Sequence, residues 1–146
     1  MSRSIVQERT LVLHIGTAKT GTTALQKFLY RNQTKLSKYG IFLSNNLKRP
    51  NNSDLPAYFN SGVSKALRRQ GIYNQLAKKE YFSGFEDRFA REDQSLPIDA
   101  TVIITSEDFP NRLIKPAEFQ AAHDFLRRYF EKIVVVCYFR PQSEWE

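Results

Sequence analysis

Three short apolar runs in the chain are rich in β-branched residues and are bounded by polar or turn residues. Runs of this length and composition are typical of strands buried in a parallel sheet, where both faces are covered. The segment after Gly40 adds a fourth, shorter run. The pattern therefore predicts strands at residues 11–15, 40–44, 101–105 and 133–138.

Two stretches between these runs repeat apolar residues at helical spacing. The first ends at Gly40, a typical helix stop, and its apolar positions are Leu25, Phe28, Leu29 and Leu36. The second begins at Pro116, because proline is common at the first helical position. Its apolar positions are Phe119, Ala122, Leu126, Tyr129 and Phe130. Alternating strands and helices predict an α/β fold, with a parallel sheet flanked by helices.

The middle of the chain, residues 47–99, has a different pattern. It opens with a loop at residues 48–53 and continues as polar sequence that is compatible with helices and has no clear strand. We expect a helical insertion of two or three helices there. The 146 residues as a whole are expected to form a single domain, because one domain commonly has about 100–200 residues.

Composition and charge narrow the class of protein. The chain is 41% hydrophobic and 25% charged, which excludes a disordered or collagen-like chain. Its formal charge is +7, and residues 30–91 hold 12 Lys or Arg against 4 Asp or Glu. An anionic ligand or partner is therefore expected. Basic and aromatic residues are interleaved in this segment, as in some nucleic-acid sites, but the spacing also fits a solvated helix face, which we favour.

The cysteine and histidine content limits the chemistry. Cys137 is the only cysteine, which excludes an internal disulfide, and with two histidines a zinc site is not expected. His14 either contacts a ligand or packs against the neighbouring strand, and packing is the favoured interpretation. His123 is interpreted as a packing or boundary residue. The sequence also lacks a long apolar segment and a secretory signal, so a cytoplasmic location is expected.

The most informative segment is residues 11–26 (LVLHIGTAKTGTTALQ), where a predicted strand passes through Gly16 and Gly21 into a predicted helix. Glycines let the backbone wrap closely around an anion, and the N–H groups of the loop and helix start point toward it. Thr20, Thr22 and Thr23 add hydroxyl donors. The segment therefore predicts a phosphate-binding loop rather than a simple glycine-rich turn.

This loop departs from the ordinary phosphate loop, in which lysine directly follows the second glycine. Thr22 occupies that position here, and Lys19 precedes Gly21 by two residues. The lysine is therefore expected to approach the phosphate from the loop and not from the helix.

Residues 14–26 (HIGTAKTGTTALQ) resemble the 5′-phosphosulfate loop of sulfotransferases, whose core is Lys-[Ser/Thr]-Gly-Thr-Thr. The match is closest to the bacterial and carbohydrate branch of that family. Its members transfer a sulfonate group from 3′-phosphoadenosine 5′-phosphosulfate (PAPS) to a hydroxyl and release adenosine 3′,5′-bisphosphate, without a metal. The resemblance implies a P-loop fold of sulfotransferase type. It also implies that the donor is bound by Lys19, Thr20, Gly21, Thr22 and Thr23.

A second segment, residues 134–145 (VVVCYFRPQSEW), resembles the family's 3′-phosphate segment, a strand that ends in Tyr-x-Arg. The resemblance implies that Arg140 holds the 3′-phosphate, a role that suits a planar, bidentate cation. The family's partner serine falls beyond Glu146, and Ser143 is too close to Arg140 to replace it. We therefore expect the chain to be the N-terminal, donor-binding part of the domain, incomplete at its C-terminus.

Transfer of a sulfonate group to a hydroxyl requires a base that takes the proton of the acceptor hydroxyl. Residues 105–109 (TSEDF) directly follow a predicted strand, at the edge where open α/β sheets bind ligands. Glu107 is the candidate base and Asp108 is the second choice. The alternative is that these carboxylates form a turn or cap a short helix.

The sequence therefore predicts a PAPS-dependent sulfotransferase with Lys19 and Glu107 as catalytic residues. Its acceptor is expected to be a glycan hydroxyl, from the resemblance alone. Two alternatives stay open: a P-loop kinase or ATPase that uses Mg²⁺, and a non-catalytic module that binds anions or nucleic acid. The sequence does not indicate an oligomeric state.

Overall fold

A computed structural model describes residues 8–16, 22–48 and 51–139. Four strands form one parallel sheet in the order β2-β3-β1-β4. Their bounds are Thr10–His14 for β1, Ile41–Leu43 for β2, Thr101–Thr105 for β3 and Lys132–Val136 for β4. The predicted α/β class and the positions of all four strands are confirmed.

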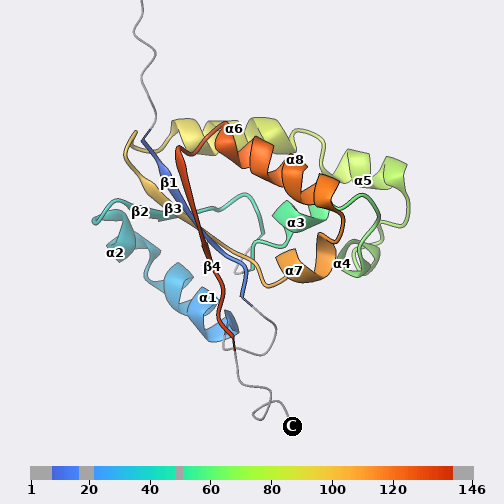
Figure 1. Ribbon diagram of the computed structural model, residues 1–146, viewed down its shortest axis with the longest axis horizontal. Helices are drawn as coiled ribbons and strands as arrows, with labels where there is room; N and C mark the ends of the chain where they lie inside the picture. The colour runs from blue at the N-terminus through green and yellow to red at the C-terminus, as the bar shows by residue number, and fades with distance from the viewer. Residues whose placement is uncertain (1–7, 17–21, 49–50, 140–146) are drawn as a thin grey trace, which may run out of the picture.

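Helices cover both faces of the sheet (Figure 1). Helices α1 (Thr22–Arg31) and α2 (Gln33–Ser37) lie on one side, and the helices from α3 to α8 lie on the other. The latter are α3 (Asp54–Phe59), α4 (Lys65–Arg68), α5 (Gln75–Tyr81), α6 (Phe85–Gln94), α7 (Phe109–Arg112) and α8 (Pro116–Arg127). None of the helices in the described ranges is long and apolar enough to cross a membrane.

The insertion at residues 47–99 is helical, as predicted, but its described part contains four helices rather than two or three. Capping side chains and a glycine turn separate these helices. The Ser64 hydroxyl caps α4, and the Asn74 side chain accepts a hydrogen bond from Ala77 N at 2.8 Å to cap α5. Gly84, with a φ of +74°, makes the left-handed turn into α6. Short helices that are separated by such caps carry little periodic signal.

Aromatic packing attaches the insertion to α8. On the same side of the sheet, apolar residues of β1 and β3 join the cluster. Ring centroids in the cluster lie 4.3–6.5 Å apart, a range in which aromatic pairs add about 0.5–1.5 kcal/mol beyond their buried area. The rings belong to Tyr58, Phe59, Phe82, Phe85, Phe89, Phe125 and Tyr129.

Strand β4 corrects the prediction that each apolar run is a buried strand. Val135 is 57% exposed and Val134 is 36% exposed. The reason is position, since β4 pairs only with β1 and forms an edge of the described sheet. The apolar composition of the run predicts a strand correctly, but it does not say how many neighbours that strand has.

The helix faces also differ from the predicted ones. Phe28 is 60% exposed and Phe119 is 45% exposed, whereas Gln26 and Glu118 are buried. Glu118 is accommodated by four hydrogen bonds from Ser61 N and Oγ, Ile114 N and Lys115 N. The bond from the Ser61 hydroxyl is the main cause that lowers the pKa of this carboxyl to about 2. Polar groups with such partners can replace apolar ones in a buried face.

We predict that Phe125→Ala lowers the free energy of unfolding by about 3–5 kcal/mol, because it removes a ring that is 3% exposed and leaves a cavity. Urea denaturation measures the change. Phe119→Ala is the matched control on the same helix, and it is expected to cost much less because its ring is 45% exposed. Equal losses for the two variants would contradict the placement of the core.

Candidate functional site

The parallel register brings three strand ends to one edge of the sheet. One row across the sheet holds Thr105 of β3, His14 of β1 and Val136 of β4. A hydrogen bond from Ser106 N to His14 O (2.9 Å) holds β3 against β1 just past this row. In open α/β sheets, ligands bind at this carboxyl edge. The residues two positions past the row are Gly16, Glu107 and Tyr138.

The predicted phosphate loop has the expected framework of strand, loop and helix. Gly16 follows β1 with a φ of +34°, a conformation that favours glycine, and α1 begins at Thr22. The side chain of Thr23 is exposed on the first turn of α1. The positions of Lys19, Thr20, Gly21 and Arg140 and the side chain of Thr22 lie outside the described residues. Phosphate binding by this loop stays a prediction.

Glu107 lies where the sequence predicts it, just beyond the end of β3. Its side chain is half-buried. Burial lowers the pKa of His14, and the negative charge of Glu107 opposes that shift. The carboxyl edge of the sheet thus carries an acidic group between the loop framework and α7.

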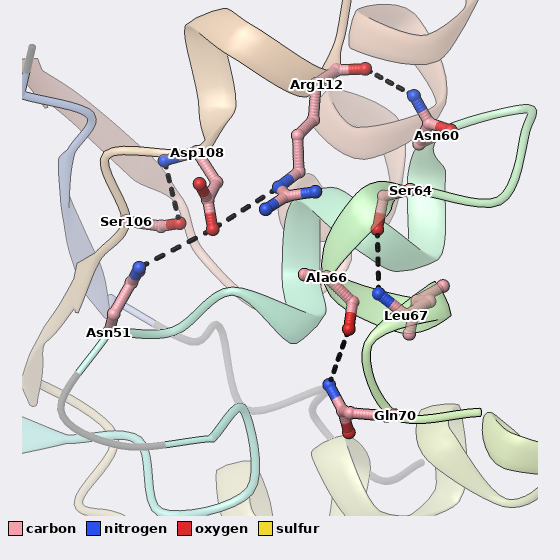
Figure 2. A network of polar contacts seen from close by, with 9 residues as sticks. All are labelled: Asn51, Asn60, Ser64, Ala66, Leu67, Gln70, Ser106, Asp108 and Arg112. Carbon is pink, nitrogen blue, oxygen red and sulfur yellow. Dashed lines mark hydrogen bonds and ion pairs between the residues drawn. The ribbon is translucent and has the colours of Figure 1, made fainter. Parts of the chain in front are cut away.

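Asp108 has a structural role in the turn after β3 (Figure 2). Its carboxylate accepts a hydrogen bond from Asn51 Nδ2 at 3.5 Å and pairs with Arg112 Nε at 3.3 Å. Its backbone N–H donates to Ser106 Oγ at 3.3 Å. These contacts hold the loop before α3 against α7. Asp108 is therefore an anchor of this turn, although its side chain makes no capping hydrogen bond to α7.

A buried polar network lies beneath this edge, and no local pattern in the chain predicts it. His14 Nδ1 is 2.8 Å from Thr105 Oγ1, which confirms that this imidazole packs against the neighbouring strand. Gln26 Nε2 from α1 donates to the same hydroxyl at 3.4 Å. All three side chains are buried. The network joins β1, β3 and α1 directly below the loop framework.

Asn52 completes this network from the loop that precedes α3. Its N–H donates to Thr105 O at 2.9 Å, and its Oδ1 accepts from Thr105 N at 3.0 Å. Its Nδ2 donates to Tyr30 Oη at 2.9 Å and to Lys48 O at 2.8 Å. Asn52 therefore takes the place of a neighbouring strand at the end of β3. An asparagine in a polar loop predicts only a turn, so no local signal identifies this role.

The remaining candidate groups are dispersed. His123 is exposed and lies 3.4 Å from the Asp124 carboxylate, and Cys137 is a half-buried free thiol rather than a core residue. In the part of the chain that the structure describes, no three His, Cys, Asp or Glu side chains are grouped to hold a metal ion. The groups that could act chemically therefore gather at the carboxyl edge of the sheet.

We predict that Thr105→Val lowers the free energy of unfolding by about 1–3 kcal/mol, because His14 and Gln26 lose a buried partner. Thr101→Val is the matched control, since Thr101 lies on the same strand outside this network. Urea denaturation of both variants measures the difference. A Thr105 variant as stable as its control would show that the network contributes nothing to stability.

We also predict that the protein loses stability as the pH falls through 6.5. His14 has a pKa below its ordinary 6.5 in the folded chain, so the unfolded chain binds the proton first as the pH falls. The urea midpoint should therefore be lower at about pH 5.5 than at about pH 7.5. His14→Gln should weaken this dependence. An unchanged dependence in that variant would assign the effect to other groups.

A comparison with known proteins completes the description of the site. No family model, curated protein or solved structure matches the chain. The function is therefore inferred from the chemistry of the residues and from their placement at the carboxyl edge of the sheet.

Proposed function

We propose that the protein is a PAPS-dependent sulfotransferase whose donor site lies at the carboxyl edge of the sheet. The resemblance of residues 14–26 and 134–145 to the sulfotransferase motifs identifies the donor. The observation that carries the proposal is the alignment of the ends of β1, β3 and β4. This alignment brings the segments that lead to Lys19, Glu107 and Arg140 to one edge.

The proposed reaction is a direct transfer. The acceptor's hydroxyl oxygen attacks the sulfur atom, and the bond between sulfur and the bridging oxygen of the 5′-phosphate breaks. Glu107 takes the hydroxyl proton as general base. Lys19 and the loop N–H groups stabilise the negative charge that develops on the leaving phosphate oxygen. The products are a sulfate ester and adenosine 3′,5′-bisphosphate, and the protein first holds both reactants in line.

The acceptor is proposed to be a glycan hydroxyl, in line with the branch that the loop resembles most. An acidic glycan would suit the basic segment at residues 30–91. In that segment Lys65, Arg68 and Arg69 are exposed on and beside α4. Their charge is thus available to attract an anionic partner or donor.

We predict that Glu107→Gln lowers turnover by about 10²–10⁴-fold and leaves the affinity for adenosine 3′,5′-bisphosphate unchanged, because only the base is lost. Lys19→Ala should lower turnover by about 10²–10³-fold. Release of the bisphosphate from PAPS, with a mixture of oligosaccharides as acceptors, measures turnover, and calorimetry measures binding. Glu131→Gln and Lys27→Ala are matched controls, because both side chains are exposed, Glu131 at the amino end of β4 and Lys27 within α1, and neither follows the carboxyl end of a strand.

The same titrations separate the proposal from its alternatives. ATP with Mg²⁺ that binds more tightly than adenosine 3′,5′-bisphosphate would favour a kinase or ATPase and contradict the proposal. Steeply salt-dependent binding of RNA that survives Lys19→Ala, without binding of the bisphosphate, would indicate a nucleic-acid module.

A further inference from the structure

One nitrogen of the His14 imidazole has a hydrogen-bond partner, and the other has none among the described residues. The side chain is only 3% exposed. Nδ1 contacts Thr105 Oγ1 at 2.8 Å, whereas Nε2 is buried and has no hydrogen-bond partner within the described ranges. Buried polar groups are nearly always paired, so an orphan nitrogen next to a candidate ligand site requires an explanation.

The contacts of Thr105 are compatible with a hydrogen on Nε2 of His14. Gln26 Nε2 donates to the Thr105 hydroxyl, so this hydroxyl acts there as an acceptor. We assign the single hydrogen of the hydroxyl to the contact with His14 Nδ1, although the second lone pair of the oxygen would equally accept a hydrogen from Nδ1. With this assignment the neutral imidazole carries its own hydrogen on Nε2, and nitrogen NMR tests it. Burial lowers the pKa of His14, which favours this neutral form near pH 7.

His14 lies at the carboxyl edge of the sheet, close in the chain to the predicted phosphate loop. His14 is the last residue of β1, and Gly16 begins the turn two residues later. The imidazole ring is 5.4 Å from the ring of Tyr138, which follows β4 toward Arg140. An unpaired buried donor costs about 1–3 kcal/mol, a cost that a bound acceptor would remove. At this edge the matching acceptor is an anionic oxygen.

We propose that His14 is a further oxyanion-binding residue, whose Nε2–H donates to a phosphate or sulfonate oxygen of the bound nucleotide. This inference rests on the proposed function, because the nucleotide is the assigned ligand. The network of Gln26, Thr105 and Asn52 holds the donor in a fixed orientation before the ligand arrives. A donor fixed in this way does not have to reorganise when it binds charge.

Nitrogen NMR of the full chain tests the proposal directly, because the chain has only two histidines. His123→Gln assigns the two sets of imidazole signals, and His123, which is exposed, serves as the internal reference. We expect the hydrogen of His14 on Nε2 without ligand, and a shift of that nitrogen when adenosine 3′,5′-bisphosphate is added. A hydrogen on Nδ1, or an Nε2 signal that does not move although calorimetry shows binding, would overturn the proposal.

Two substitutions at His14 provide the matched variants. Asparagine can replace Nδ1 next to Thr105 but has no group at the Nε2 position, whereas glutamine can place a donor near that position. His14→Asn should weaken binding of the bisphosphate about tenfold or more, because a hydrogen bond to a charged group is lost. His14→Gln should retain more of the affinity. Wild-type affinity in the asparagine variant, at an unchanged urea midpoint, would overturn the proposal.

A second probe separates this inference from the proposed function. Inorganic pyrophosphate supplies phosphate oxygens without the nucleoside, in two linked groups like the phosphosulfate of the donor. If it shifts the Nε2 signal while the bisphosphate does not bind, the oxyanion site is supported and the sulfotransferase function is contradicted. If neither anion shifts the signal, the role of His14 is overturned.

Discussion

The structure of the candidate site depends on one residue, Thr105, at which four segments meet. Its hydroxyl contacts His14 from β1 and Gln26 from α1, and its backbone N–H and C=O pair with Asn52 from the loop before α3. Each of these groups is buried, so each must find a partner inside the protein. The arrangement that satisfies them also fixes the end of β1, the start of α1 and the end of β3 relative to one another. Those three points define the site.

The two faces of the sheet are stabilised in different ways. The face toward α8 is apolar, and its aromatic rings hold the insertion. The face toward α1 carries the polar network at its carboxyl end. An apolar face tolerates changes of similar volume, whereas a polar network requires specific atoms at specific positions. The polar face therefore positions the groups proposed to bind the donor, and the apolar face supports the insertion with its exposed basic residues.

Two adjacent carboxylates at the end of β3 have different environments. Asp108 is engaged by Asn51 and Arg112, which ties α7 to the loop before α3. Glu107 lies one residue earlier and is half-buried. The contacts of Asp108 maintain the shape of the edge, and Glu107 is the carboxylate proposed to act as the base.

Local periodicity and the parallel order of elements are enough to predict the strands, the two main helices and the edge at which candidate groups meet. Which faces are buried depends on the packing of the folded chain: β4 is exposed at the edge of the described sheet, and Phe28 and Phe119 face solvent. Packing also brings Gln26 and Asn52 into hydrogen bonds with Thr105, although these residues are far apart in the sequence. Burial and hydrogen bonding depend on partners brought together from distant segments, and no local pattern in the chain encodes those partners.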